Sequence, residues 1–191
     1  MTTELCDLAY KYRTDKCPKI RHSYTLFYFD LFKNIRKKIK KVFEMGIGTP
    51  TIMDHCGKEY VIGASLYMWR DFFPNAKIYG ADIQPEAIFE DDRIKTFLAD
   101  QSSEEDMKRV IEAVGGDIDI FIDDGNHYRD KQFDLARIAL PMLKKDVIYI
   151  IEDSYSVQWL VSELTKLGYE CSVPKLSKVG YRESLILVRN K

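Results

Sequence analysis

The sequence lacks most features that mark membrane, secreted or metal-thiolate proteins. No apolar run approaches the ~18 residues of a membrane-spanning helix, and the N-terminus has no apolar signal-peptide core. No C-x-x-C pair occurs, and the scattered cysteines are Cys6, Cys17, Cys56 and Cys171. This disfavours a zinc site or a disulfide framework. We therefore expect reduced thiols in a cytoplasmic protein without membrane contact.

An excess of charge of either sign is also missing. The chain has 29 Lys and Arg against 30 Asp and Glu, a formal net charge of −1, so no global attraction to nucleic acid is expected. A basic run at positions 33–41 leaves an RNA substrate open as an alternative. The simpler interpretation is that cations near a helix C-terminus complement the helix dipole, so we do not expect nucleic-acid binding.

Hydrophobic periodicity predicts alternating helices and strands. Apolar residues recur at helical spacing from Tyr24 to Ile39, and a face of Leu5, Leu8 and Tyr12 indicates a short helix before it. Further helices are predicted over 64–73, 103–114, 128–143 and 157–167. Strands are predicted from Val42 and over 77–82, 93–100, 118–124 and 146–151, and two final antiparallel β runs over 169–173 and 184–189, around a turn at Gly180. Residues 49–63 are predicted to form a loop.

This alternation predicts an α/β fold with a Rossmann-like doubly wound sheet, mostly parallel with an antiparallel C-terminal strand. The chain has 191 residues, enough for one domain with a sizeable core, so we expect a single domain.

The predicted strands end in acids. These are Glu44, Asp82, Asp100 with Gln101, Asp123 with Asp124, and Glu152 with Asp153. Ligands bind at the carboxyl ends of strands in such sheets, and a helix N-cap explains one such acid but not five in succession. After the first strand, VFEMGIG supplies Gly46 and Gly48 for a sharp turn. An acid after the second strand suits a ribose diol. The G-x-G pattern is shorter than the glycine motif of proteins that bind nicotinamide dinucleotides, so it favours these cofactors less.

Several motifs together resemble a known family. The stretches VFEMGIG, IYGADI, FLADQSS and IDIFIDDGNH are similar to successive motifs of class I S-adenosylmethionine-dependent methyltransferases. Residues 12–16 and 22–25, with SLYMWRDFFPNAKIYGADI, IDDGNH and IIEDSY, resemble more narrowly the macrolide-sugar O-methyltransferase and cephalosporin hydroxylase-like group. The resemblance extends from about residue 8 to 155, and residues 49–63 do not follow its pattern. It implies an N-terminal lid segment and helix over 1–40 and a cofactor-binding core over 41–191.

The resemblance also implies site residues. Glu44, Gly46 and Gly48 would frame the amino-acid end of S-adenosylmethionine, Asp82 would bind its ribose, and Asp100 and Gln101 would lie beside adenine. The implied cofactor set also contains Ser65, Ile83, Ser102 and Asp123. The implied lid or substrate residues are Thr14, Asp15, Lys16, His22 and Tyr24. A magnesium ion would be held by Asp123 or Asp124 together with Glu152 and Asp153.

Physical chemistry supports the metal and a base independently. Carboxylates that converge on one edge repel each other unless a cation neutralises them, and hard oxygen ligands suit magnesium. His127 follows the fourth of these acidic strand ends, Asp123 with Asp124, and imidazole titrates near neutral pH. We therefore expect His127 to remove a proton, with Asp124 as the other catalytic candidate. The alternative is that His127 only forms a hydrogen bond at a helix start.

The expected function is an S-adenosylmethionine-dependent O-methyltransferase that acts on a small-molecule or sugar hydroxyl in natural-product or glycan biosynthesis, assisted by Mg²⁺. The alternatives are another acceptor, namely an amine, a phosphorylated intermediate, a phenol or RNA, or a non-catalytic S-adenosylmethionine-binding partner protein. The presence of both the cofactor-side acids and the metal-side acids argues against the last, because a protein that only binds the cofactor would not need His127 or Glu152. The identity of the acceptor and a homo-oligomeric state are left open.

Overall fold

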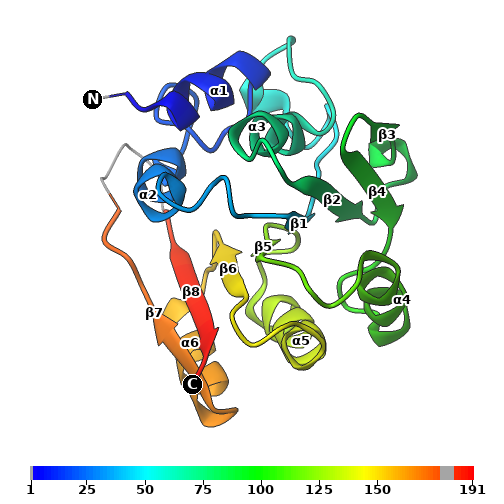
Figure 1. Cartoon of the computed structure of the whole chain (residues 1–191), viewed down its shortest axis with the longest axis vertical. Coiled ribbons are helices and arrows are strands. Elements are labelled where there is room, and N and C mark those ends of the chain that lie inside the picture. Colours follow the sequence, from blue (N-terminus) through cyan, green and yellow to red (C-terminus); the bar gives the residue numbers. More distant parts are fainter. Residues whose placement is uncertain (1, 177–182) are drawn as a thin grey trace.

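The strands form one sheet of eight in the computed structural model, which describes residues 2–176 and 183–191 (Figure 1). From edge to edge the sheet contains β3 (Glu90–Asp91), β4 (Ile94–Leu98), β2 (Lys77–Asp82), β1 (Lys41–Met45), β5 (Ile120–Asp123), β6 (Ile148–Glu152), β8 (Leu185–Asn190) and β7 (Tyr169–Ser172).

The direction of the strands places a crevice at the end of β1. Strands β4, β2, β1, β5 and β6 are mutually parallel, whereas β3, β8 and β7 pair antiparallel with their neighbours. The chain first builds outward from β1 through β2 to β4, then returns to the other side of β1 with β5 and β6. Loops at such a reversal diverge and leave a binding crevice at the carboxyl ends of the strands. The predicted Rossmann-like sheet, mostly parallel with antiparallel C-terminal strands, is confirmed.

Helices cover both faces of the sheet (Figure 1). One face is covered by α1 (Glu4–Tyr12), α2 (Tyr24–Phe32) and α3 (Ala64–Phe72), and the other by α4 (Glu104–Val114), α5 (Arg129–Ala139) and α6 (Val157–Lys166). Alternate side chains of β1 supply the two cores, with Val42 in one and Phe43 in the other. This is why the inner strands are apolar on both faces.

The N-terminal residues form part of the first core. Leu5, Tyr28 and Phe32 are fully buried and share an apolar cluster with Val42 and Ile78 of the sheet. Burial of a large apolar side chain contributes about 1.5–3 kcal/mol. Helices α1 and α2 are therefore part of a helical layer of the fold. Their connection, residues 13–23, lies at the carboxyl ends of the central strands.

The helix predicted from Tyr24 to Ile39 is too long. Helix α2 ends at Phe32, and turns follow in which Ile35 N donates to Phe32 O at 2.9 Å and Lys38 N donates to Ile35 O at 2.8 Å. A continued helix would crowd the cations of the basic run, and like charges at helical spacing repel. The turns let the chain enter β1 at Lys41. The basic run follows the helix C-terminus, as expected.

Most other boundaries agree with the sequence within a few residues. Ser103 caps α4 by accepting a hydrogen bond from Asp106 N at 3.2 Å, as predicted. The helix predicted over 128–143 ends at Ala139 and continues as a 3-10 turn, η3 (Leu140–Met142), at Pro141. The other 3-10 turns are η1 (Asp54–Cys56) and η2 (Pro85–Ala87).

At the edges of the sheet, the structure contains one strand that the sequence did not predict, and one predicted turn falls outside the described residues. The short β3 was not predicted, because two residues carry no periodic signal. The antiparallel β7–β8 pair is confirmed, while the turn expected at Gly180 lies outside the described residues. None of the helices in the described ranges is long and apolar enough to cross a bilayer.

Candidate active site

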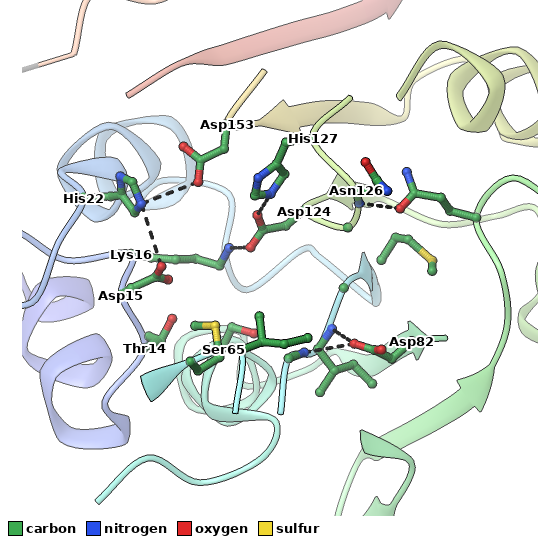
Figure 2. A pocket seen from close by; sticks show the side chains of 18 of the residues that line it. Thr14, Asp15, Lys16, His22, Ser65, Asp82, Asp124, Asn126, His127 and Asp153 are labelled. Atoms are coloured by element: carbon green, nitrogen blue, oxygen red, sulfur yellow. Dashed lines mark hydrogen bonds and ion pairs between the residues drawn. The ribbon is translucent and has the colours of Figure 1, made fainter. Parts of the chain in front are cut away.

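A cavity of about 710 Å³ opens at the carboxyl ends of the parallel strands (Figure 2). Its walls come from the connection between α1 and α2, the glycine turn after β1, and the loops that follow β2, β4, β5 and β6. It is therefore located at the crevice that the strand order predicts, and it contains many of the residues expected from the motifs.

The glycine turn depends on close backbone approach at Gly46. This residue has φ +92°, and a Cβ atom there would lie 2.1 Å from the carbonyl oxygen of Asp124. Its N–H donates to Ala81 O at 2.8 Å. Only glycine allows both the positive φ and the contact between the turns after β1 and β5.

Asp82 holds the same turn from β2 (Figure 2). Its Oδ2 accepts hydrogen bonds from Ile47 N at 2.8 Å and Gly48 N at 2.9 Å, and its Oδ1 accepts from Gln84 N at 2.9 Å. The carboxylate lines the cavity and has further lone pairs. Its expected contact with a ribose stays a prediction, but the structure adds a second role, the shaping of the glycine turn.

The loop after β4 presents an unused donor. Gln101 Oε1 accepts from Asn126 N at 2.5 Å, whereas Gln101 Nε2 is buried without a hydrogen-bond partner. Asp100 accepts from Ser102 N at 2.8 Å, and all three side-chain positions from 100 to 102 line the cavity. An unsatisfied buried donor costs about 1–3 kcal/mol, which a ring-nitrogen acceptor such as adenine would recover. Ser65 and the exposed Ile83 also line the cavity.

Lys16 lies among three of the acidic strand ends, and Figure 2 shows its ammonium group directed at Asp124. Its side chain is 1% exposed, and its Nζ is 2.5 Å from Asp124 Oδ2, 2.7 Å from Glu152 Oε2 and 3.2 Å from Glu44 Oε1. Burial lowers the pKa of Lys16, but the three carboxylates raise it to well above its ordinary value. The cation that neutralises these acids is thus supplied in part by the chain itself, which the sequence analysis did not anticipate.

Glu44 and Glu152 are enclosed rather than open to the cavity. Glu44 Oε2 accepts from Trp69 Nε1 at 2.6 Å, and Glu152 Oε1 accepts from Tyr28 Oη at 2.5 Å. Burial raises the pKa of both carboxyls, that of Glu152 strongly. Neither residue lines the cavity. The expected roles of Glu44 at the cofactor and Glu152 at a metal therefore have no direct geometric support.

Asp124 connects Lys16 to His127 (Figure 2). The Nε2 of His127 is 3.3 Å from Asp124 Oδ1, while Asp124 Oδ2 faces Lys16. Burial raises the pKa of Asp124, but Lys16 and then His127 lower it to well below the ordinary value. Burial lowers the pKa of His127, and its hydrogen bond to Asp124 raises it more, so the net shift is upward. An ionised aspartate that orients an imidazole is a typical acid–base pair.

Asp153 completes a group able to hold a cation. Asp124, His127 and Asp153 each offer one ligand atom, and these atoms lie within 4.8 Å of one another. Asp153 has φ +52° and accepts a short hydrogen bond from the Tyr24 hydroxyl. Burial and the charge of Asp124 raise the pKa of Asp153. Two carboxylates with one imidazole form a donor set that fits a divalent cation.

Asp123 does not take the place expected for it. Its side chain is fully buried and does not line the cavity. Successive side chains of a strand point to opposite faces, so Asp124 reaches the cavity while Asp123 turns away from it. Burial raises its pKa well above the ordinary value. The expectation that Asp123 contacts the cofactor or a metal is therefore not met.

The residues expected to form a lid lie against the acids. His22 is 3% exposed, with Nε2 3.5 Å from Asp153 Oδ2 and 3.7 Å from Asp15 Oδ2. Its ring stacks on Tyr24 with centroids 4.9 Å apart. Thr14, Asp15, Lys16 and His22 line the cavity, whereas Tyr24 does not. Motion over a ligand stays a prediction, and these residues are part of the cavity wall here.

Three contributors were not anticipated. Tyr60 donates to Ile47 O at 3.0 Å and so supports the glycine turn. Tyr155 is 69% exposed, and its ring centroid lies 6.1 Å from that of His127. Glu183 accepts from Ser23 N at 2.6 Å beside His22. Tyr60 and Glu183 come from segments without periodicity, and only the IIEDSY motif gave a signal, for Tyr155.

No family model matches the chain, whereas comparison with known proteins finds related methyltransferases. The 8-demethyl-8-(2-methoxy-alpha-L-rhamnosyl)-tetracenomycin-C 3'-O-methyltransferase of Streptomyces olivaceus is 33% identical over 153 residues, which cover 80% of this chain and 37% of that protein. The mycinamicin VI 2''-O-methyltransferase of Micromonospora griseorubida is 31% identical over 156 residues, 82% of this chain and 37% of that protein.

A solved structure extends the similarity to the whole fold. The MycE methyltransferase of the mycinamycin biosynthetic pathway, in complex with Mg and SAH, has a TM-score of 0.78 and 24% identity, covering 100% of this chain and 56% of that one. The chain thus spans well under two thirds of the length of these relatives. The resemblance drawn from the motifs is confirmed: this chain has the fold of the class I methyltransferases, and its homologues are macrolide and sugar O-methyltransferases.

Proposed function

We propose that the chain is an S-adenosylmethionine-dependent O-methyltransferase that methylates a hydroxyl group of a sugar or glycoside, with a divalent cation at Asp124 and Asp153. The observation that carries this proposal is the His127–Asp124 contact of 3.3 Å inside the cavity that also contains the glycine turn. The same cavity can therefore hold a cofactor next to a general base. The named relatives support a sugar hydroxyl as the acceptor.

The cofactor half of the cavity fits S-adenosylmethionine. The turn at Gly46 and Gly48 allows the amino-acid end to approach the backbone, Asp82 suits the ribose hydroxyls, and Gln101 Nε2 is an orphaned donor for adenine. Bound S-adenosylmethionine supplies an electrophilic methyl group on a sulfonium. The residues of this half would hold that group in line with an acceptor hydroxyl, and orientation of this kind lowers the barrier of a displacement.

The catalytic half positions the acceptor hydroxyl. Neutral His127 would accept the hydroxyl proton at Nδ1, because its Nε2 faces the carboxylate of Asp124. The acceptor oxygen would take the methyl group as S-adenosylhomocysteine leaves, and Asp124 would stabilise the imidazolium that forms. A divalent cation held by Asp124 and Asp153 would supply Lewis-acid polarisation of a sugar oxygen. His127 would serve as the base while the two carboxylates bind the cation.

The rim of the cavity favours a ring-shaped acceptor. Tyr155 is 69% exposed and Tyr128 is 65% exposed, and their rings meet edge-to-face with centroids 6.3 Å apart beside His127. Aromatic faces bind the apolar C–H face of a sugar or the body of an aglycone. A net charge of −1 gives an RNA acceptor no comparable support.

Release of S-adenosylhomocysteine with simple rhamnosides and macrolide glycosides tests the proposal. Wild type should be stabilised against heat by S-adenosylmethionine and should form product in the presence of Mg²⁺. His127→Ala should bind S-adenosylmethionine normally but lose about 10²–10⁴-fold in rate. Stabilisation by NAD without any response to S-adenosylmethionine would refute the methyltransferase. Normal binding with no turnover on any acceptor class would favour a non-catalytic binding protein.

A further inference from the structure

Lys16 has an unusual position for a lysine. It comes from the connection between α1 and α2, yet its ammonium group is buried between the carboxyl ends of β1, β5 and β6. A buried charge is costly unless it is paired, and Lys16 is paired with three carboxylates at 2.5–3.2 Å. The arrangement therefore requires both signs of charge to be present.

Two of the carboxylates hold the ammonium group from inside the protein. Glu44 is fully buried and Glu152 is 1% exposed. Each is also anchored by an aromatic donor, Trp69 Nε1 for Glu44 and Tyr28 Oη for Glu152. The other carboxylate oxygen of each acid faces Lys16. These two acids therefore hold the ammonium group from the protein interior and do not line the cavity.

The third carboxylate is shared with the cavity. Asp124 has one oxygen 2.5 Å from Lys16 and the other 3.3 Å from His127, and its side chain is 20% exposed. A cation bound on the cavity side of Asp124 would therefore lie only a few ångströms beyond the ammonium group. Two positive charges on one carboxylate repel each other strongly in a partly buried site.

We propose that Lys16 is a resident counter-ion of the strand-end carboxylates and that its charge sets how tightly Asp124 and Asp153 bind a divalent cation. It acts as a positioning residue through Asp124. This inference rests on the divalent-cation part of the proposed function. It predicts that the net charge of the enclosed cluster of Lys16, Glu44 and Glu152, rather than ligation by Glu152, controls the affinity.

A charge series tests the proposal, with Mn²⁺ as the probe ion and calorimetry or electron paramagnetic resonance as the readout. Lys16→Met removes the positive charge and should tighten Mn²⁺ binding about tenfold or more, whereas Lys16→Arg should stay within about threefold of wild type. Glu152→Gln should weaken binding about tenfold. The double variant Lys16→Met/Glu152→Gln keeps the net charge and should bind nearly as wild type does.

Each outcome decides the question. Folded Lys16→Met with unchanged or weaker Mn²⁺ binding would overturn the proposal. If Lys16→Met does not fold, Glu152→Gln and the double variant decide. A double variant that binds Mn²⁺ as weakly as Glu152→Gln, or more weakly, would make Glu152 a ligand and overturn the proposal as well. Absence of Mn²⁺ binding to every folded variant would also overturn it.

Thermal stabilisation by S-adenosylmethionine, measured on the same proteins, separates this result from the proposed function. If wild type binds no Mn²⁺ while Lys16→Met does, the counter-ion role stands and the cation requirement of the native enzyme fails. If no variant responds to S-adenosylmethionine, the methyltransferase proposal fails whatever the Mn²⁺ series gives.

Discussion

A Cβ atom on Gly46 would lie 2.1 Å from the carbonyl oxygen of Asp124, so the turn after β1 and the turn after β5 touch backbone to backbone. This contact brings the cofactor side and the acid–base side of the cavity together. It leaves no room for a side chain, and it places the Asp124 carboxylate beside both Lys16 and His127.

Gly46→Ala should therefore separate the two halves of the site. We expect a loss of stability larger than the about 1–3 kcal/mol that positive φ alone costs a residue with a side chain, together with loss of S-adenosylmethionine binding. Gly57→Ala is the matched control, because Gly57 has φ +89° but a Cβ atom added there would have no neighbour within 4 Å. Denaturant unfolding and calorimetry measure both. Equal effects of the two substitutions would mean that steric contact with Asp124 is unimportant.

Asp82 should matter both for the cofactor and for the turn. Asp82→Ala removes the acceptor of the Ile47 and Gly48 amides, and hydrogen bonds to a charged group are worth about 1.5–3 kcal/mol. We expect weaker S-adenosylmethionine binding by at least tenfold in calorimetry, with a lower melting temperature. Asp92→Ala, at an exposed position of the next loop, should change neither. Unchanged cofactor affinity in Asp82→Ala would remove the ribose contact from the proposed function.

Tyr155 should affect the acceptor and spare the cofactor. Tyr155→Ala removes an exposed ring next to His127. We therefore expect the KM for a glycoside acceptor to rise about tenfold, which corresponds to a loss of roughly 1.4 kcal/mol of binding free energy. Tyr155→Phe keeps the ring face and should remain near wild type. Steady-state kinetics with saturating S-adenosylmethionine measures the difference. Equal losses in both variants would point to the hydroxyl group instead of the ring face.

Asp119 should make the stability of the protein dependent on acid pH. Its carboxylate accepts hydrogen bonds from Lys41 N at 2.9 Å, Lys40 N and Lys144 Nζ. Burial raises the pKa of Asp119, but these three donors lower it by more than burial raises it. The folded-state pKa therefore lies below its ordinary value. The stabilisation is then present above the unfolded-state pKa of about 3.9 and is lost as pH falls through the folded-state pKa.

The test is the free energy of unfolding from pH 7 to pH 2. Asp119→Asn should be less stable than wild type by about 1–3 kcal/mol at pH 7, and the difference should shrink as the pH falls below about 4. Asp146→Asn alters an 83% exposed carboxylate 3.7 Å from the same Lys144 and should change little. A difference that stays constant down to pH 2 would show that Asp119 does not act through its charge.

The order of elements and the edge of the sheet that holds the site follow from the sequence alone. Apolar spacing is a local property, so the strands ending at Asp82 and at the Asp123–Asp124 pair were predicted nearly to the residue. Acids at the carboxyl ends of parallel strands must meet at one edge. The boundary of α2 was predicted less well, because its apolar pattern continues past Phe32 while the backbone turns toward β1.

Only the tertiary structure decided which acids face the cavity and what neutralises them. Lys16 and Asp124 are 108 residues apart, and no periodicity links a lysine in a connecting segment to a strand end that far along the chain. The strand alternation that hides Asp123 and exposes Asp124 depends on where β5 stops, which a sequence pattern locates only to a residue or two. Charge pairing in a buried site is a property of distances, and distances between remote residues are set by packing.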